Sequence, residues 1–318
     1  MEEFDFYPQK PDLIEHKPKG GVSLTIFSLV LFVMVFLLLA GDSIEFVMYL
    51  VVILLIHELG HLLFMKLFKY ENVRMLFVPL MGAFVQGKKK GQSQRESFLV
   101  TLAGPIPGVI FGAVLVVLSC AEQTEWMASL GIMFLLLNII NLLPLDPLDG
   151  GQTFKLMFRK QHELFLMVFA FISSLVLIGV GWMFNLYVLM IFGFFMGFRV
   201  RAMQKRHQVH KNLLEEEINY STTYKLLSNR DFVRIKEILI QHTPALQKYI
   251  DQVSSDEADP VIASQVNNVL DTPLKNDASI LFKIIVLLCW LGAFATPIYL
   301  FYSFDLQWYW EALTMHGI

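Results

Sequence analysis

The chain has 318 residues and a formal net charge of −3; 55% of its residues are hydrophobic and only 17% are charged. A soluble domain of this length carries about 25% charged residues, so the composition predicts an integral membrane protein surrounded by the lipid bilayer. The small negative charge argues against a nucleic-acid partner. The two cysteines lack metal-ligand spacing, and nothing in the sequence requires a disulfide between them.

Seven apolar runs recur along the chain, and most reach the ~20 residues that a transmembrane helix needs. We therefore predict an all-α polytopic membrane protein with about seven transmembrane helices. The fifth and sixth runs are separated by a very short link, which predicts a tight hairpin that turns near Asn185. The runs cover approximately residues 22–41, 44–65, 98–119, 127–143, 164–182, 184–198 and 280–303.

The basic residues predict the orientation of these spans. If the N-terminus lies in the cytoplasm and the spans alternate, all 25 Lys and Arg residues fall in inner segments and none in outer loops. This is the distribution that the positive-inside rule describes, and an even number of spans would break it. We therefore expect a multi-pass protein of a prokaryotic cytoplasmic membrane, with its C-terminus outside.

The predicted organisation has five parts. A loose cytoplasmic tail at 1–21 precedes a transmembrane core of six spans at 22–201. A cytoplasmic helical insert at 202–279, a seventh span at 280–303 and an outer tail at 304–318 follow.

The insert is expected to contain three or four short helices. Two of them are predicted to begin at Thr243-Pro244 and Asp259-Pro260, because a capping residue followed by proline is typical of a helix start. The position of the insert favours a regulatory partner or substrate docking there. The alternative interpretation is a solvated spacer.

A short membrane-associated β segment is predicted between the second and third spans. Residues 73–86 are apolar but are broken by Pro79 and Gly82, and they are too few to span as a helix. A strand pair or a re-entrant loop fits this pattern, and its edge could hold an extended substrate. An interfacial loop without a role is the alternative.

The second run contains the motif His57-Glu58-Leu59-Gly60-His61. On a helix, positions i and i+4 share a face, so both imidazoles can bind one metal ion while Glu58 acts as a general base. Ionisable groups at membrane depth are costly and usually functional. The alternative is a chance pair of core histidines.

A catalytic zinc needs a third protein ligand. The best candidate is Asp149, because Pro144 and Pro147 disrupt the fourth span just before it. Gly150 and Gly151 are expected to allow a sharp turn that folds the carboxylate back towards the membrane interior. Asp146 is a second carboxylate nearby and an alternative ligand.

The motif at His57, together with Asn141-x-x-Pro144-x-x-x-x-Asp149-Gly150, resembles the site-2 protease family of intramembrane zinc metalloproteases. The likeness covers about residues 44–151, and Ala103-Gly104-Pro105 is also similar to the family. In two places the chain departs from the family pattern. Asp146 replaces a residue that is usually uncharged, and Ile106, Pro107 and Gly108 occupy positions where the family often has an asparagine.

The resemblance implies that His57, His61 and Asp149 bind Zn²⁺ and that Glu58 is the catalytic base. It implies that Asn141 orients the scissile carbonyl or stabilises its oxyanion. It also implies a transmembrane protein substrate, cleaved within or near its transmembrane segment at an active site towards the cytoplasm.

Three other functions are weighed against an intramembrane protease. A catalytically silent relative that binds transmembrane segments would not need intact His, Glu and Asp residues. A metal transporter would need polar residues in several spans, and the last three runs have almost none. A membrane-bound HExxH enzyme with a glutamate as third ligand would need a Glu after the fourth run, where none stands.

Cysteine labelling tests the predicted topology. A cysteine placed at residue 318 should react with an impermeant reagent added to intact cells, whereas one placed at residue 230 should react only after permeabilisation. The reverse pattern would refute both the span count and the cytoplasmic position of the insert.

Overall fold

The structure is a computed structural model, and it divides the chain into two compact units. We call residues 18–160 with 275–318 the core unit, and residues 1–17 with 161–274 the hairpin unit. Each unit is described by itself. The residues whose structure is described are 7–14, 21–40, 44–79, 82–89, 91–145, 147–158, 162–183, 185, 187–271 and 273–309.

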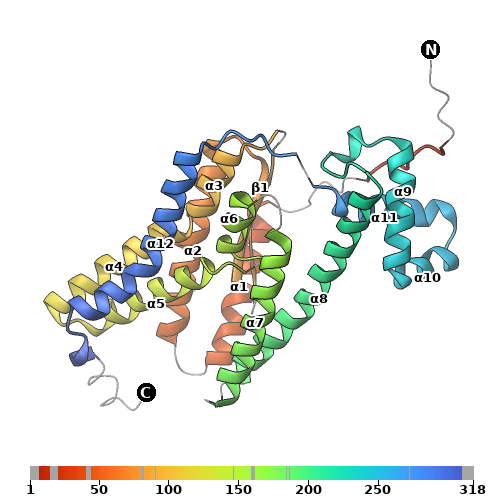
Figure 1. Ribbon diagram of the computed structural model, residues 1–318. Coiled ribbons are helices and arrows are strands. Elements are labelled where there is room, and N and C mark those ends of the chain that lie inside the picture. The colour runs from red at the N-terminus through yellow and green to blue at the C-terminus, as the bar shows by residue number, and fades with distance from the viewer. Residues whose placement is uncertain are drawn as a thin grey trace. The chain divides into compact units, whose positions relative to one another are not determined.

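The core unit is built from seven helices and a pair of strands among the described residues (Figure 1). In chain order these are α1 (Val22–Ala40), α2 (Ile44–Leu67), β1 (Glu71–Val78), β2 (Gly82–Lys88), α3 (Gln94–Leu102), α4 (Pro105–Glu122), α5 (Glu125–Asn141), α6 (Asp149–Met157) and α12 (Ile280–Ser303). The prediction of a mostly helical fold with a short β segment is confirmed.

Four stretches of helix in the described residues are long and apolar enough to cross a membrane: Ile44–Leu67, Gln94–Glu122, Leu164–Met183 and Ile280–Ser303. The apolar helices at Val22–Leu38 and Glu125–Asn141 are shorter. These six segments match six of the seven predicted runs. The count of seven spans stays a prediction.

The strands pair antiparallel, with Met75 opposite Val85 and Phe77 opposite Ala83. Phe77 packs into a small buried cluster whose other members are Phe32 of α1, Leu50 and Leu54 of α2, and Met75. This alternation of buried residues fixes one face of the hairpin against α1 and α2, because a strand directs every second side chain to the same face.

Helix α1 covers the outer edge of β1. The Thr25 hydroxyl donates to the Met75 carbonyl over 2.7 Å, and the Phe77 amide donates to the Ser28 hydroxyl over 3.1 Å. Residues 75 and 77 therefore direct their backbone groups away from β2. Because opposite residues in an antiparallel pair share this orientation, their partners Val85 and Ala83 direct theirs to the outer edge of β2.

Helix α12 closes the core unit, where it packs on α4 and α5 (Figure 1). Its Trp290 indole N–H donates to the Leu142 carbonyl over 2.9 Å, just past the end of α5. Asp277 precedes α12 and accepts from the Ser93 hydroxyl and the Arg95 amide. Desolvation would raise the pKa of Asp277, but these hydrogen bonds outweigh it and hold the pKa below its ordinary value.

The hairpin unit begins with two helices that pack side by side, α7 (His162–Met183) and α8 (Tyr187–Glu215). Asn185 lies between them with φ of 56°, a left-handed conformation that asparagine tolerates. The Ser174 hydroxyl donates to the Gly193 carbonyl over 2.7 Å across the pair. The predicted hairpin near Asn185 is confirmed.

After α8 the chain forms a short 3₁₀ turn, η1 (Tyr224–Leu226), and three helices, α9 (Asn229–His242), α10 (Pro244–Gln252) and α11 (Ser255–Val269). They share a buried core that includes Leu213, Phe232 and Ile262. The short helices expected in this region are thus confirmed, and Thr243-Pro244 starts α10 as expected. The cytoplasmic insert at 202–279 stays a prediction.

The expected helix start at Asp259-Pro260 is wrong. Ser254 is the N-cap, so α11 begins at Ser255 and Pro260 lies inside it. Proline there removes one backbone donor from the helix. Burial of Ala258, Ile262 and Ala263 on one face of α11 offsets this loss.

The N-terminal segment 7–14 is bound to the hairpin unit, so the prediction of a loose tail is wrong for these residues. The Lys10 ammonium donates to the carbonyls of Tyr224, Lys225 and Leu227, and the Lys10 amide donates to Asn229 Oδ1. The Tyr224 hydroxyl donates to the Pro11 carbonyl over 2.8 Å. Burial, with Asp12 and Asp259 nearby, raises the pKa of Tyr224 to about 12, so its hydroxyl remains a donor.

Lys10→Met should release this segment, because methionine keeps the apolar stem but leaves the three carbonyls without their donor. One hydrogen bond to a charged group contributes about 1.5 kcal/mol or more, so amide exchange in residues 7–14 should be roughly tenfold faster. Hydrogen–deuterium exchange followed by mass spectrometry measures this. Lys225→Met removes the same charge from an exposed side chain and should leave the exchange unchanged.

Candidate metal centre

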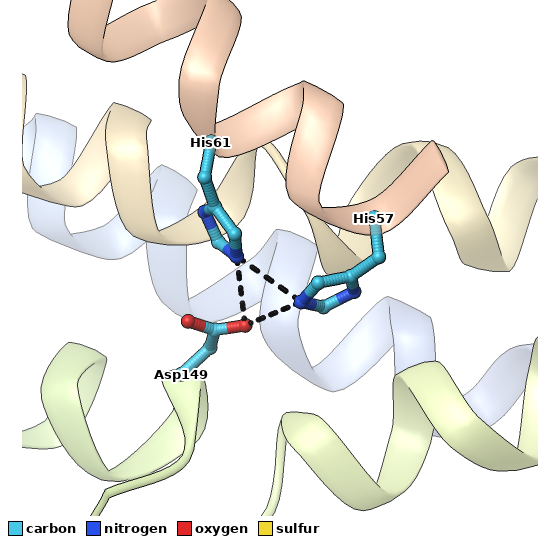
Figure 2. Close-up of side chains that lie close together, drawn as sticks. All are labelled: His57, His61 and Asp149. Carbon is cyan, nitrogen blue, oxygen red and sulfur yellow. Dashed lines mark hydrogen bonds and ion pairs between the residues drawn. The ribbon is translucent and has the colours of Figure 1, made fainter. Parts of the chain in front are cut away.

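The two histidines of the motif lie one turn apart on α2 and point to the same side (Figure 2). Both are buried: His57 is 3% exposed and His61 is 7% exposed. Their Nε2 atoms are 3.1 Å apart. The helical spacing of four residues therefore produces the shared face that the sequence predicted.

Asp149 approaches the same point from another part of the chain. Helix α5 ends at Asn141, and a short loop through Pro144 leads to Asp149, the first residue of α6. The Asp149 carboxylate oxygen Oδ2 lies 3.0 Å from His57 Nε2 and 3.2 Å from His61 Nε2. The predicted return of this carboxylate towards the α2 histidines is confirmed.

The expected role of Gly150 and Gly151 in a sharp turn is wrong. Both residues lie in the first turn of α6. Gly150 is needed for space, because a Cβ there would lie 1.9 Å from the Leu142 carbonyl oxygen and 2.3 Å from that of Leu143. The first turn of α6 thus packs directly on the backbone that follows α5.

Two further glycines make room for the histidines. A Cβ on Gly60 would lie 2.0 Å from the Ala103 carbonyl oxygen, at the break between α3 and α4. A Cβ on Gly104 would lie 2.4 Å from His61 Nε2 and 2.9 Å from His57 Nε2. The break at Ala103-Gly104 therefore forms a cradle around the imidazoles that any larger residue would fill.

Hydrogen bonds determine which ring nitrogens carry protons. His61 Nδ1 lies 2.7 Å from the Val100 carbonyl, which can only accept, so Nδ1 carries the proton. His57 Nδ1 lies 2.8 Å from Asn138 Oδ1, which likewise accepts. In both neutral rings the Nε2 lone pair then faces Asp149.

This arrangement fits a zinc ion. Among the described residues, His57, His61 and Asp149 form the group whose ligand atoms are close enough to share a metal. Tetrahedral ligands at about 2.0–2.1 Å from zinc lie roughly 3.3 Å from one another, close to the 3.0–3.2 Å observed here. A cation bound at this buried point would accept the three electron pairs that converge there.

Glu58 follows His57 on α2 and is 3% exposed. Its Oε2 atom has no hydrogen-bond partner, and the backbone of Val85 of β2 lies close to the carboxylate. Burial of a carboxylate oxygen without a hydrogen-bond partner costs free energy. Such a group is a candidate for acting on a bound ligand or substrate.

The remaining sequence predictions have different outcomes. Asn141 is the last residue of α5 and forms no hydrogen bond with the three clustered side chains, so its role stays a prediction. Asp146, the alternative ligand, lies outside the described residues. Asn138 contacts His57 but received no role from the sequence. As a polar residue inside an apolar run it carried a usable signal.

Comparison with known proteins agrees with this site. Residues 45–128 match the model of peptidase family M50. Stage IV sporulation protein FB of Bacillus subtilis is 31% identical over 119 residues, which are 35% of this chain and 40% of that protein. A zinc metalloprotease of Methanocaldococcus jannaschii is 27% identical over 114 residues, 34% of this chain and 32% of that protein.

The chain thus matches less than half the length of either relative. A solved site-2 protease structure from Methanocaldococcus jannaschii aligns with 56% of this chain and 88% of its own, at 21% identity and a TM-score of 0.44. The matched family segment contains the α2 motif and the Gly104 cradle. The resemblance of this chain to the site-2 protease family, a group of membrane metallopeptidases, is confirmed.

Zinc content tests the ligand set. The purified protein should hold about one zinc per chain, as expected for three converging ligands, and His57→Ala, His61→Ala or Asp149→Ala should each remove most of it. Elemental analysis measures the content. His242→Ala, in the hairpin unit, is the matched control and should retain zinc. Loss of zinc in Asp146→Ala together with full zinc in Asp149→Ala would reassign the third ligand.

Proposed function

We propose that the protein is an intramembrane zinc metalloprotease that hydrolyses peptide bonds within or near transmembrane segments of membrane proteins. The observation that carries this proposal is the convergence of His57 Nε2, His61 Nε2 and Asp149 Oδ2 within 3.2 Å of one another in a buried site. The buried Glu58 carboxylate stands on the same helix, next to His57.

The chemistry divides between the metal and the chain. Bound Zn²⁺ would supply a Lewis acid that polarises the scissile carbonyl and makes water more acidic. His57 and His61 would hold it through Nε2, and Asp149 through Oδ2. Glu58 takes a proton from the attacking water and later gives it to the leaving amine.

Glu58 is suited to this proton transfer because its buried Oε2 atom has no hydrogen-bond partner. Burial keeps bulk water from competing for the free oxygen. Asn141 is proposed to donate its side-chain N–H to the developing oxyanion or to the scissile carbonyl, as the family resemblance implies.

The outer edge of β2 is proposed to hold the substrate. A transmembrane substrate must unwind before cleavage, because helical carbonyls are already hydrogen-bonded, and an unwound strand can pair with an open sheet edge. The edge of β1 is covered by α1, whereas Ala83 of β2 directs its backbone groups outwards. Since Val85 also contacts Glu58, a strand added to β2 would lie beside the catalytic base.

The setting of the enzyme is also proposed. The active site is expected to face the cytoplasm of a prokaryotic cell from within a multi-pass protein of the cytoplasmic membrane. The packed helices α9–α11, with the bound N-terminal segment, are proposed as the surface for a regulatory partner. They form a folded module of their own that follows the catalytic residues in the sequence.

Glu58→Gln should retain zinc and abolish cleavage. Glutamine has nearly the same shape but cannot accept a proton from water, so the rate should fall at least about 100-fold. Cleavage of a reconstituted transmembrane substrate in proteoliposomes measures the rate, and elemental analysis measures the zinc. Glu45→Gln, on the same helix, is the control and should cleave normally. A wild-type protein that binds zinc and substrate but never cleaves would instead be a silent relative.

Ala83→Pro should weaken cleavage with zinc unchanged. Proline removes the outward backbone donor of Ala83 without breaking the ladder to β1, because that donor faces away from β1. Loss of one edge hydrogen bond should reduce kcat/KM by roughly twofold to tenfold. Ala83→Ser keeps the donor and serves as the control.

Equal activity of Ala83→Pro and Ala83→Ser would refute substrate pairing at this edge. Phe77 and Leu80 are less suitable sites for the same test. Phe77 belongs to the buried cluster with Phe32, so a proline there would damage the core. Leu80 lies outside the described residues.

A further inference from the structure

The Asn138 side chain joins α5 to the metal centre. It is fully buried, with none of its surface exposed, and it bonds to two groups. Its Oδ1 atom lies 2.8 Å from His57 Nδ1, and its Nδ2 atom donates to the Phe134 carbonyl over 2.7 Å. Both polar ends of the amide are therefore engaged.

These two contacts determine the orientation of the amide. The Phe134 carbonyl can only accept, so the NH₂ end of Asn138 must face it. The oxygen end is then left for His57 and can only accept, so the proton of the neutral imidazole must reside on Nδ1. The His57 Nε2 lone pair is thereby directed to Asp149 and His61.

A glycine on the facing helix provides the space for this amide. A Cβ on Gly108 of α4 would lie 2.2–2.4 Å from the Nδ2, Cγ and Oδ1 atoms of Asn138. The volume beside α4 is thus occupied by the Asn138 amide, which reaches it from α5. Asn138 and Gly108 form a matched pair.

We propose that Asn138 is a positioning residue that holds His57 in its metal-binding tautomer, and that Gly108 is glycine to admit it. The inference rests on the proposed function, because it concerns affinity for the proposed zinc. Groups that bond to the remote nitrogen of a metal-binding histidine typically change metal affinity by 10- to 100-fold. We do not propose that Asn138 contacts the substrate.

The test compares two substitutions with opposite consequences. Asn138→Leu has similar size but no acceptor for His57 Nδ1–H. Asn138→Asp keeps the acceptor, loses the donor to the Phe134 carbonyl and buries a charge. A purely structural role predicts that aspartate is the worse replacement, whereas positioning predicts that leucine is worse for zinc.

Zinc affinity of the full-length protein in detergent is measured by competition with a chelator of known affinity. We expect a 10- to 100-fold loss in Asn138→Leu and a loss of less than about threefold in Asn138→Asp. The cobalt-substituted proteins should show altered absorption bands in Asn138→Leu alone. Ser119→Ala removes a different buried polar group, a hydroxyl on α4, and should leave affinity unchanged.

The paired glycine provides a second test that does not alter Asn138. Gly108→Ala should displace the amide and lower zinc affinity, whereas Gly131→Ala crowds the same helix pair against Leu115 and Val116 and serves as the control. In an Asn138→Ala background, adding Gly108→Ala should cost little more, because the space is then free. This cycle keeps the inference testable if Asn138→Leu does not fold.

Three results would overturn the inference: wild-type affinity in Asn138→Leu, equal losses in Asn138→Leu and Asn138→Asp, or additive losses from Gly108→Ala and Asn138→Ala. A wild-type protein with no zinc affinity would refute the proposed metal centre itself. That outcome can be distinguished from failure of the inference, because the zinc affinity of the wild-type protein is measured before any variant is compared.

Discussion

Two imidazole nitrogens and one carboxylate oxygen meet at a single buried point, and the packing of the core unit brings them there. A zinc ion bound between them, as proposed, would accept the three lone pairs, and a hydrogen bond on the far side of each ring keeps Nε2 directed at that point. Val100 and Asn138 provide those bonds from α3 and α5. Close contact of backbone with backbone at Gly60 and Gly150, and of Gly104 with the two imidazoles, then brings the helices near enough for the atoms to meet.

This constraint explains why the apolar helix α5 ends where it does. Asp149 reaches α2 only if the chain turns after Asn141, and the turn leaves carbonyl groups without helical partners in an apolar setting. Trp290 of α12 donates to one of them, at Leu142. Helix α12 follows Asp149 by more than 130 residues, yet it supports the loop on which the third proposed ligand depends.

The hairpin unit, in contrast, is stabilised by a hydrophobic core. Its helices after α8 form a conventional core of buried aliphatic and aromatic side chains, and the N-terminal segment adds Leu13 to that core and Lys10 to the carbonyls of η1. The segment that was predicted to be a loose tail is thus held in place by one ammonium group and a few apolar contacts. Short polar sequences give little sign of such docking, because the partner lies more than 200 residues away.

The sequence by itself determined the features that depend on neighbours along the chain. The four-residue spacing put His57 and His61 on one face of a helix, Pro144 ended α5 ahead of Asp149, and the break at Pro79 and Gly82 separated two strands. It also located the turn at Asn185 and the helix that starts at Pro244. All of these follow from backbone geometry within a few residues.

Only the tertiary structure decided which helix faces which. The role of Asn138 depends on the contact of its amide with His57 of α2, and the need for glycine at 108 depends on the amide that fills its space. Gly150 was expected to turn the chain and instead lets two backbones touch. Pro260 was expected to start a helix, but α11 begins at Ser255 and Pro260 lies inside it. Contacts such as those of Asn138 with His57 and Gly108 join residues far apart in the chain, and local sequence patterns do not encode such packing partners.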